Sequence, residues 1–554
     1  MSKKWQNYLS QCGRRMKERL KTHGLLLLIV ALGLWVRGWK LGEWPQGLNR
    51  DEAAIAYNAY LITQTGKDEW QRVYPVFFES FGDQKLPGYP YVVAFLFQWL
   101  PINDAVVRLP SCLAGVGLIV IAYFLVWTLG KAKKCRQHLT ITASLTALLV
   151  ALNPVFIWYS RGAWEANLAL FWLMLAVLLI WRHYYYRRGW QVWSLLAVFV
   201  LLMLSFLTYN SPLLIATVAL VFLPWWLWRA GKEFWGPLWV SVAVAVVTCF
   251  VLLIPVNRQK TGISIFTDAT VHYQYLQYRE HLPAWLLPVA GSRYVYWLGK
   301  LAETTGLSFS PRFWWHGGSH PWHQLSNFGV LHWSTGLWLY VTLVSLLIVT
   351  ALSWRGQKFF SQKLVVSAKI LSLVVICLVP SVITVDSPHV TRSLVFFYVL
   401  ILLGGCWLLY VREIWHRRHY QWSQWLVIGL LFLTLGEAGW YLYSYKHYFL
   451  THNLYQAGLA DFLPTLTHEK PVLVWSPTEP SMRQYEYIIF AWELKLAPDL
   501  FWHTQIRENA DTVGIKGISD LLDYHFADDG IQLPGNWQII RYNTDKQQWE
   551  RAHD

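Results

Sequence analysis

The sequence predicts an all-α polytopic membrane protein with about eleven transmembrane helices and a small C-terminal α/β region. Composition is the first reason, because 55% of the 554 residues are hydrophobic and only 14% are charged, which is too apolar for a soluble chain of several domains. The length of the apolar runs is the second reason. The apolar residues fall into runs of about twenty, the length that a helix needs to cross roughly 30 Å of hydrocarbon.

The net charge of +15 has two interpretations, a nucleic-acid partner or membrane topology. The lysines and arginines stand in short clusters between apolar runs, and not on one face of a folded domain. We therefore interpret them as topology signals and expect membrane lipids, and no nucleic acid, as partners. The six cysteines show neither metal-ligand spacing nor a disulfide framework.

The N-terminal segment from Lys3 to Lys21 is basic and precedes an apolar stretch, as in a secretory signal. No small-residue cleavage site follows Val36, because the chain continues into Arg37 and Trp39. We therefore expect an uncleaved signal anchor, with residues 1–23 as a cytoplasmic basic tail.

The apolar runs predict the individual spans. They lie near residues 24–40, 108–130, 139–159, 164–182, 192–209, 212–229, 236–256, 335–353, 364–384, 391–411 and 423–443. Under this assignment every short basic loop falls on the cytoplasmic side, which satisfies the positive-inside rule. The localisation that follows is the cell (inner or plasma) membrane.

This topology depends on the segment from Tyr89 to Leu100, which must not span. It has about a dozen residues before Pro101, which is too few for a crossing. We predict a helix lying at, or dipping into, the outer surface. Counting it as a span would place the later basic loops outside.

Three long stretches then face outward: residues 41–107, 257–334 and 444–554. The membrane domain would cover residues 24–443 with the first two stretches as its outer loops. The third stretch, which this topology places outside, would form a small α/β domain, because it is less apolar and has strand-like runs at Pro471–Trp475 and Trp537–Tyr542 with turn signals.

An adjacent carboxylate pair, Asp51 and Glu52, lies just after the first span. Ionised groups at this depth are costly unless they have partners or a task. A second interpretation is an acidic helix N-terminus, which the helix dipole favours. The local pattern leaves both open.

Lys85 lies in the first outer loop, in the segment Ser80 to Tyr89, which also holds Asp83 and leads into the predicted surface helix. A lysine ammonium at headgroup depth suits a phosphate as a point charge. The alternative is a snorkelling lysine that anchors the surface helix.

Two arginines, Arg161 and Arg392, break the positive-inside pattern because they fall in short outer loops. Something local should compensate each charge, either an anionic ligand or a buried carboxylate. For Arg161 a structural ion pair with Glu165 at i,i+4 is the alternative.

The second outer loop contains a segment from Phe309 to His323 that is rich in tryptophan, histidine and glycine. It could stack against a sugar ring or a carrier lipid, and we favour such substrate contact, with His320 as a candidate. Tryptophans also gather at membrane interfaces for generic reasons, and loosely spaced histidines are a weak zinc signal. We expect no metal site and no required cofactor.

Several segments resemble one family when they are taken together and in order. They are Leu48–Ala53, Thr65–Glu69, Phe81–Pro87, Val107–Ser111, Ser160–Arg161 with Glu165–Asn167, and Ser387–Arg392. The chain resembles bacterial members of the protein O-mannosyltransferase and aminoarabinose transferase superfamily, glycosyltransferases of the GT-C fold that use a phospholipid carrier. Leu86 stands where relatives often have a second proline, and Arg50 also departs from the pattern.

The resemblance implies an enzyme, a hexosyltransferase or mannosyltransferase of the cell envelope that takes a sugar from a polyprenyl phosphate. Asp51 would be the general base for a lipid, glycan or protein acceptor, with Glu52 orienting it or binding the acceptor. Lys85 and Arg392 would hold the donor phosphate. Asp83, Arg161, Glu165 and His389 would line the site.

The chemistry fits these residue types without the analogy. An inverting displacement needs a base to take the acceptor proton and cations to stabilise the charge on the leaving phosphate. A transporter or flippase of lipid-linked glycans is the main alternative, but it predicts discontinuous helices in matched halves, and the sequence has no such symmetry. A membrane scaffold, or a polymerase using a diphosphate carrier, fits the charged residues less well.

Overall fold

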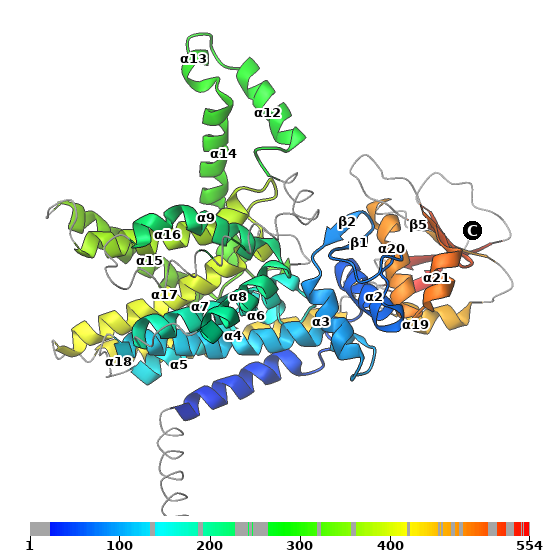
Figure 1. The fold of residues 1–554 in the computed structure, drawn as a ribbon, viewed down its shortest axis with the longest axis horizontal. Coiled ribbons are helices and arrows are strands. Elements are labelled where there is room, and N and C mark those ends of the chain that lie inside the picture. Colours follow the sequence, from blue (N-terminus) through cyan, green and yellow to red (C-terminus); the bar gives the residue numbers. More distant parts are fainter. Residues whose placement is uncertain are drawn as a thin grey trace, which may run out of the picture.

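The computed structural model describes residues 23–132, 139–186, 192–227, 242, 246, 264–317, 323–355, 362–417, 422–451, 455, 458–466, 471–475, 480–507, 518–527, 537–543, 546 and 548–552. These residues form an elongated molecule with a helical bundle at one side (Figure 1). A second region, made of short helices and a sheet, lies at one end of that bundle. We call this end the sheet end.

The bundle begins with an apolar helix, His23–Gly38. Its other members are α4 (Asp104–Ala132), α5 (Leu139–Leu152), α6 (Pro154–Trp158), α7 (Glu165–Tyr186), α8 (Val192–Phe206), α9 (Asn210–Leu227), α15 (Trp333–Arg355), α16 (Gln362–Val382), α17 (Val390–Arg417) and α18 (Trp422–Thr451). Each predicted span within the described residues coincides with one or two of these helices. The span predicted at residues 236–256 lies outside the described residues, apart from two isolated positions.

Five of these helices, α4, α7, α15, α17 and α18, are long and apolar enough to cross a membrane. Other apolar helices in the described residues have 10 to 17 residues. The chain is therefore a multi-pass membrane protein with a mostly helical fold. The total of about eleven spans stays a prediction.

The predicted span at residues 139–159 is broken into α5 and α6. Pro154 lacks the amide that would continue α5, so the helix ends at Leu152 and a new one begins. Asn153 fills the break, because its side chain donates to Leu149 O at 2.7 Å and accepts from the His332 amide at 3.1 Å. The break thus fixes the start of α15 against α5.

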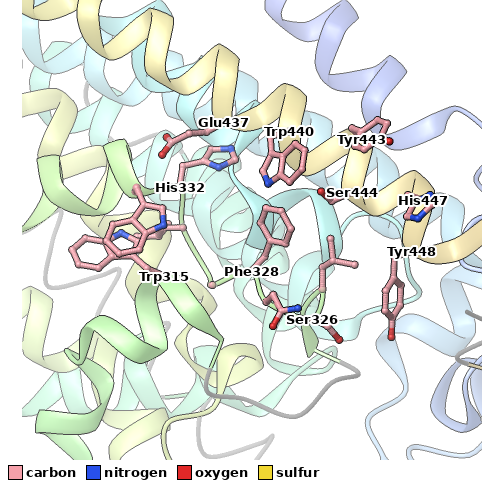
Figure 2. A pocket seen from close by; sticks show the side chains of 15 residues that line it. Trp315, Ser326, Phe328, His332, Glu437, Trp440, Tyr443, Ser444, His447 and Tyr448 are labelled. Carbon is pink, nitrogen blue, oxygen red and sulfur yellow. The ribbon is translucent and has the colours of Figure 1, made fainter. Parts of the chain in front are cut away.

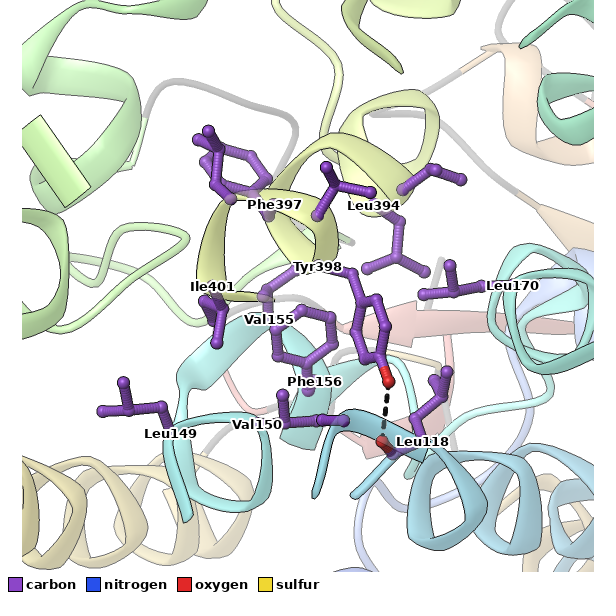
Figure 3. Close-up of a cluster of buried hydrophobic side chains, with 14 of the residues drawn as sticks. Leu118, Leu149, Val150, Val155, Phe156, Leu170, Leu394, Phe397, Tyr398 and Ile401 are labelled. Carbon is purple, nitrogen blue, oxygen red and sulfur yellow. Dashed lines mark hydrogen bonds between the residues drawn. The ribbon is translucent and has the colours of Figure 1, made fainter. Parts of the chain in front are cut away.

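The core of the bundle lies around α17, whose inward face packs on α4, α5 and α6 (Figure 3). Tyr398 is fully buried there, and its hydroxyl donates to Leu118 O at 2.8 Å. A buried hydroxyl needs such a partner in an apolar interior. Phe156 packs edge-on against the same ring at 5.9 Å.

The sheet end begins with α2 (Arg50–Thr65), followed by a hairpin of β1 (Phe78–Ser80) and β2 (Asp83–Lys85) and by α3 (Gly88–Phe97). Phe81 and Gly82 form the two-residue turn, and both have positive φ, 45° and 79°. A two-residue hairpin turn with positive φ at both positions matches the twist of the strands. The register places Lys85 opposite Phe78.

The helix predicted at residues 89–100 is confirmed as α3, with 10 residues, which is too short to span. One side of it faces the core beside α2, where Tyr89 and Val93 are buried. Trp99, just beyond it, is exposed.

The C-terminal region holds a six-stranded mixed sheet of order β4-β5-β6-β3-β7-β8. Its strands are β3 (Val472–Trp475), β4 (Ile506–Arg507), β5 (Ile518–Leu521), β6 (Tyr524–Ala527), β7 (Gln538–Asn543) and β8 (Gln548–Arg551). Its helices are α19 (Leu459–Phe462), α20 (Pro480–Glu493) and α21 (Pro498–Thr504), and a 3-10 turn covers Leu463–Thr465. The two strand-like runs predicted from sequence are confirmed as β3 and β7.

The C-terminal region and the loop after the first helix share one hydrophobic core. Glu69 is central to the junction, because its carboxylate accepts from the Tyr487 hydroxyl at 2.6 Å and from Ser80 at 2.7 Å. Tyr57 of α2 donates to Leu496 O at 3.1 Å. The two segments that the sequence separates by nearly the whole chain therefore form one structural unit.

A third feature is an arm at residues 264–308, which projects sideways from the bundle (Figure 1). It consists of α12 (Ala269–Glu280), α13 (Leu287–Ala290) and α14 (Arg293–Ser308). A short π-helix, η3 (Arg312–His316), follows it and leads to α15.

Candidate functional site

The acidic pair lies in the first turn of α2, and Asn49 caps this helix. The Asn49 side chain accepts from the amides of Asp51 and Glu52, both at 2.9 Å. Glu52 returns the interaction by accepting from the Asn49 amide at 3.2 Å, which completes a capping box. Asp51 and Glu52 therefore do form an acidic helix N-terminus, as the second interpretation predicts.

Glu52 is buried, and its carboxylate accepts several hydrogen bonds. Arg108, also buried, donates to both oxygens at 3.0 and 3.1 Å. The Ala163 amide donates to the same carboxylate at 2.7 Å. Arg108 additionally reaches Pro45 O at 2.8 Å and Leu41 O at 3.1 Å. This charge pair joins α2, α4 and the segment before α7.

The Asp51 carboxylate forms an ion pair with Lys85. The Lys85 ammonium lies 2.6 Å from an Asp51 oxygen and 2.9 Å from an Asp83 oxygen. Lys85 is 7% exposed, whereas Asp51 is 39% exposed. The β1–β2 hairpin thus brings two predicted site residues together with a third. We call Asp51, Asp83 and Lys85 the lysine cluster.

The charges in the lysine cluster hold each other ionised. Burial alone would raise the pKa of the Asp51 carboxyl, but the charges of Lys85 and Arg50 outweigh burial and lower the pKa. Burial alone would lower the pKa of the Lys85 ammonium, but Asp51, Asp83 and Glu165 raise it well above its ordinary value. At neutral pH the cluster holds a carboxylate and an ammonium.

Gly88 fixes how closely the lysine cluster approaches the turn between α8 and α9. Its amide donates to Leu207 O at 2.8 Å, and a Cβ at this position would lie 2.3 Å from Thr208 Oγ1. Only glycine fits so close an approach. The backbone three residues after Lys85 is therefore held against the turn between α8 and α9.

Tyr209 links the lysine cluster to the predicted arginine. Burial raises the pKa of Tyr209 to about 12, and Glu165 acts in the same direction. The charge of Arg392 opposes this shift. Glu165 thus contributes to the electrostatic environment of both Lys85 and Tyr209.

Arg392 lies at the start of α17 and pairs with Asp386. His389 lies 3.6 Å from the same carboxylate, and its ring is 4.7 Å from that of His323. Burial would raise the pKa of Asp386, but Arg392 and His389 lower it. A carboxylate therefore pairs with Arg392, but Asp386 is 46% exposed and so is not the buried carboxylate that we expected. We call Asp386, His389 and Arg392 the arginine cluster.

A hydroxyl and aromatic wall adjoins the arginine cluster. The Tyr159 and Thr391 hydroxyls are 2.5 Å apart, and each lies 3.4 Å from His323 Nδ1. Trp164 packs 5.3 Å from the His323 ring and 5.1 Å from the Tyr159 ring. Tyr159 is fully buried and Thr391 is 7% exposed, so these hydroxyls hold the wall together. The partly exposed rings of Trp164 and His323 are the part of it that is open to a ligand.

Arg161 has a different partner from the ones that we expected. Its guanidinium donates to Val36 O at 2.8 Å, Trp39 O at 2.9 Å and Trp44 O at 3.0 Å, and it is buried. These carbonyls lie at the end of the first helix and just beyond it, where the last carbonyls of a helix need donors. Main-chain carbonyls therefore replace the carboxylate or anionic ligand that we predicted as compensation.

His320 lies outside the described residues. Two tryptophans of its predicted sugar-stacking segment are packed against other parts of the chain. Trp314 is buried, stacks on Tyr340 at 4.3 Å and donates to Ser308 O at 2.8 Å. Trp315 stacks on Trp333 at 4.6 Å. Of this segment, His323 is the residue that lies beside the arginine cluster.

A cavity of about 820 Å³ lies elsewhere, between α18 and residues 325–333 (Figure 2). Its polar lining includes Glu437 and His332. The Glu437 carboxylate accepts from the Ser334 amide at 3.2 Å and so caps α15. Burial lowers the pKa of His332 to about 4, so the ring is neutral, and its Nε2 lies 2.9 Å from Leu152 O. Both groups fix α15 in place.

The sequence patterns do not single out Tyr209 or Tyr159, and they include His323 only as the last residue of the segment that begins at Phe309. Tyr209 lies in a two-helix turn that reads as generic, and its role follows only from the approach of Gly88. Glu437 could have been identified from the sequence, because an acidic residue within a predicted span is rare and needs a partner. Arg108, inside the quoted segment Val107–Ser111, had the same kind of signal.

Comparison with known proteins gives general structural likenesses. No protein-family model matches the chain, and no curated protein matches it. The solved structure of the archaeal oligosaccharyltransferase AglB from Archaeoglobus fulgidus, in complex with an inhibitory peptide and a dolichol-phosphate, is similar at 12% identity and a TM-score of 0.48. That likeness covers 85% of this chain and 60% of AglB, so the chain spans less than two thirds of its length.

ArnT from Cupriavidus metallidurans is similar in the apo state at 14% identity and a TM-score of 0.46, covering 85% of this chain and 84% of ArnT. The same protein bound to undecaprenyl phosphate is similar at 15% identity and a TM-score of 0.38, covering 85% of each chain. All three TM-scores lie below 0.5.

Proposed function

We propose that this chain is a membrane glycosyltransferase that moves a sugar from a polyprenyl-phosphate carrier to an acceptor. The observation that carries the proposal is the lysine cluster, in which an accessible carboxylate and a nearly buried ammonium are 2.6 Å apart. The arrangement supplies a proton acceptor and an anion-binding charge at one place. The sequence segments that resemble lipid-carrier-dependent glycosyltransferases include both residues.

In the proposed reaction an acceptor hydroxyl or amine attacks the anomeric carbon as its proton passes to Asp51. The bond from that carbon to the phosphate oxygen breaks, and the polyprenyl phosphate leaves with an additional negative charge. Inversion follows from a single displacement of this kind. The low pKa of Asp51 keeps it ionised and ready to accept the proton at neutral pH.

Lys85 and Arg392 have the donor-phosphate role in this proposal. Each is now paired with carboxylates, Lys85 with Asp51 and Asp83 and Arg392 with Asp386. A phosphate would compete with these carboxylates for the same donors. Binding of the donor would thereby free Asp51 from its closest cation, which raises its basicity when it is needed.

The remaining predicted residues have positioning roles in the proposal. Glu52 orients Asp51 through the capping box and its pair with Arg108. Glu165 acts on Lys85 through its charge. Asp83 holds Lys85, and His389 holds Asp386. Arg161 fixes the end of the first helix.

The proposed orientation places the sheet end outside the cytoplasm. In this orientation residues 41–107 and 444–554 form one extracytoplasmic unit over the lysine cluster, in line with the shared core. Residues 1–23 would be cytoplasmic. Since the donor is lipid-linked, no soluble nucleotide has to reach that side.

The test is a reconstituted assay with purified full-length protein and radiolabelled polyprenyl-phosphate sugars, scored for transfer and slow hydrolysis. Asp51→Asn should lose turnover and keep donor binding. Lys85→Ala should weaken donor binding, and Lys85→Arg should restore part of it because the charge is kept. Asp83→Asn is the matched control for Asp51→Asn, because it removes the other carboxylate on Lys85.

Full activity in Asp51→Asn would remove the proposed base. Equal losses in Asp51→Asn and Asp83→Asn would show that the carboxylates only hold Lys85. Lipid movement across the membrane without turnover in any variant would favour a flippase. Lys546→Ala, a change at an exposed lysine of the C-terminal region, should leave every readout unchanged.

A further inference from the structure

The arm at residues 264–308 has almost no core of its own. Among its helices the buried residues are Val271 in α12 and Thr304 and Ser308 in α14, and α13 has none. A helical hairpin with so little buried surface gains little from packing in water. Something outside the described residues should cover it.

The exposed surface of the arm is apolar and aromatic. At its tip Trp285 is 77% exposed and Val289 is 72% exposed. Along α14 the residues Tyr294, Val295 and Leu298 are also exposed, and they fall on one face of the helix because of their i, i+1, i+4 spacing.

Charged residues occupy the opposite face of α14. Lys300 and Glu303 form an ion pair there at 3.0 Å. The Arg293 guanidinium lies over the rings of Tyr294 and Trp297 at 5.2 and 5.4 Å. A helix with aromatic residues on one face and a mixed charged face is typical of the membrane interface.

The base of the arm is fixed at one level of the bundle. Thr304 donates to Val382 O at 2.8 Å, and the Ile265 amide donates to Ile383 O at 2.9 Å. Ser264 and Thr384 form a further bridge. Since α16 ends at Val382 and α17, which follows, carries the arginine cluster at its start, this level is the sheet end of both helices.

From that base the arm extends across the direction of the long helices, as Figure 1 shows. The 16 residues of α14 are about 24 Å long at roughly 1.5 Å per residue. The nearby α15 exposes Leu337, Val341 and Val344 along its length, a surface typical of lipid contact. Whatever projects sideways from a membrane bundle at the end of its spans meets the lipid interface.

We propose that the arm lies flat in the lipid headgroup region of the leaflet at the sheet end. Trp285, Val289, Tyr294 and Leu298 reach into the boundary between headgroups and acyl chains, and the Lys300–Glu303 face stays in water. The partner is the bilayer surface. The arm thereby sets the depth of residues 383–392, which hold the arginine cluster, relative to the headgroups.

The inference depends on the membrane fold and on the arm, and it does not require the proposed transferase. Its test is the depth of position 285 in full-length protein reconstituted in phosphatidylcholine–phosphatidylglycerol nanodiscs. Trp285→Cys carries an environment-sensitive fluorophore, in a background whose native cysteines are replaced by alanine. Leu500→Cys, exposed in α21 of the C-terminal region, is the matched control.

Lipids with a spin label high on the acyl chain should quench the fluorophore at position 285 at least about twofold more than the one at position 500. Iodide in the aqueous phase should show the reverse order. Strong iodide quenching at position 285, equal to that at 500, would overturn the proposal.

Two further results would also overturn it. A fluorophore at 285 that is protected from both quenchers, together with crosslinking between copies of the chain, would show a protein partner at the arm. A Val289→Asp variant gives an independent check. It should shift the fluorophore at 285 toward iodide, and an unchanged pattern would show that the apolar tip does not hold the arm in the interface.

Discussion

Asp51 and Glu52 are adjacent residues of the same type, and the structure uses them in opposite ways. Glu52 is buried and accepts from Arg108, the Ala163 amide and the Asn49 amide. Asp51 is more than one third exposed and meets a lysine. The difference shows that a charged motif contains both a structural and a chemical position, and that the number of donors around each carboxylate separates them.

The largest expected effect concerns the buried half of this comparison. Arg108→Met leaves Glu52 as an uncompensated buried charge, and such losses cost about 3–5 kcal/mol. We expect a strong fall in the yield of folded protein and in the midpoint of thermal unfolding in detergent. The double variant Glu52→Gln/Arg108→Met should recover a large part. A stable Arg108→Met protein would contradict the structural role of the pair.

Asp51→Asn tests the exposed half. If Asp51 is the base, kcat should fall by about 10²–10⁴-fold, the usual contribution of general base catalysis. The unfolding midpoint should change little, because a partly exposed ion pair contributes about 0–1 kcal/mol. Measurement of both quantities for Asp51→Asn beside Glu52→Gln gives the sharpest contrast. Similar decreases of the unfolding midpoint in the two variants would contradict the proposed difference between the two carboxylates.

The pH dependence of the reaction follows from the lowered pKa of Asp51. A lowered carboxyl pKa means that the base is active above this pKa and is lost as the pH falls through it, below the ordinary value of 3.8. We therefore expect no acid limb in kcat/KM between neutral pH and that value.

Lys85→Met sharpens this prediction. Without the ammonium, burial becomes the main influence on Asp51 and its pKa should rise, so the acid limb should move to higher pH. The pH profile of residual activity in Lys85→Met checks this. An unmoved limb would mean that another group takes the proton.

The smallest expected effect is at Gly88. In Gly88→Ala the new Cβ would lie 2.3 Å from Thr208 Oγ1 and 2.9 Å from Leu207 O, so the segment after Lys85 must shift. We expect a loss of about 1–3 kcal/mol in unfolding free energy, typical of overpacking, and a raised KM for the donor. Gly299→Ala, at a position with open space around it, is the control. Equal effects of the two changes would contradict the close approach.

The sequence was informative where one local property decides the structure. Hydropathy alone predicts α4, α7, α15, α17 and α18, and strand-like runs with neighbouring turn signals predict β3 and β7. The resemblance implies that Asp51 and Lys85 belong to one site, and the hairpin turn at Phe81 and Gly82 provides the geometry of their contact.

The rest depends on contacts between distant segments. The partner of Arg161 could not be predicted, because main-chain carbonyls leave no mark in the residue types. The position of Tyr209 depends on the close approach of Gly88 to the turn between α8 and α9, which the residue types do not predict. Pro154 indicates the break at Asn153, but the apolar residues on both sides of it predict one continuous span.

The shared core at the sheet end has a consequence for the order in which the protein is made. Tyr57 of α2 leaves the ribosome 439 residues before its partner Leu496, and Glu69 leaves it 418 residues before its partner Tyr487. Until those partners are synthesised, α2 and the hairpin lack contacts of the shared core, and domains generally fold as units. The lysine cluster would therefore reach its final geometry only after the C-terminal region has emerged and packed against α2 and the hairpin.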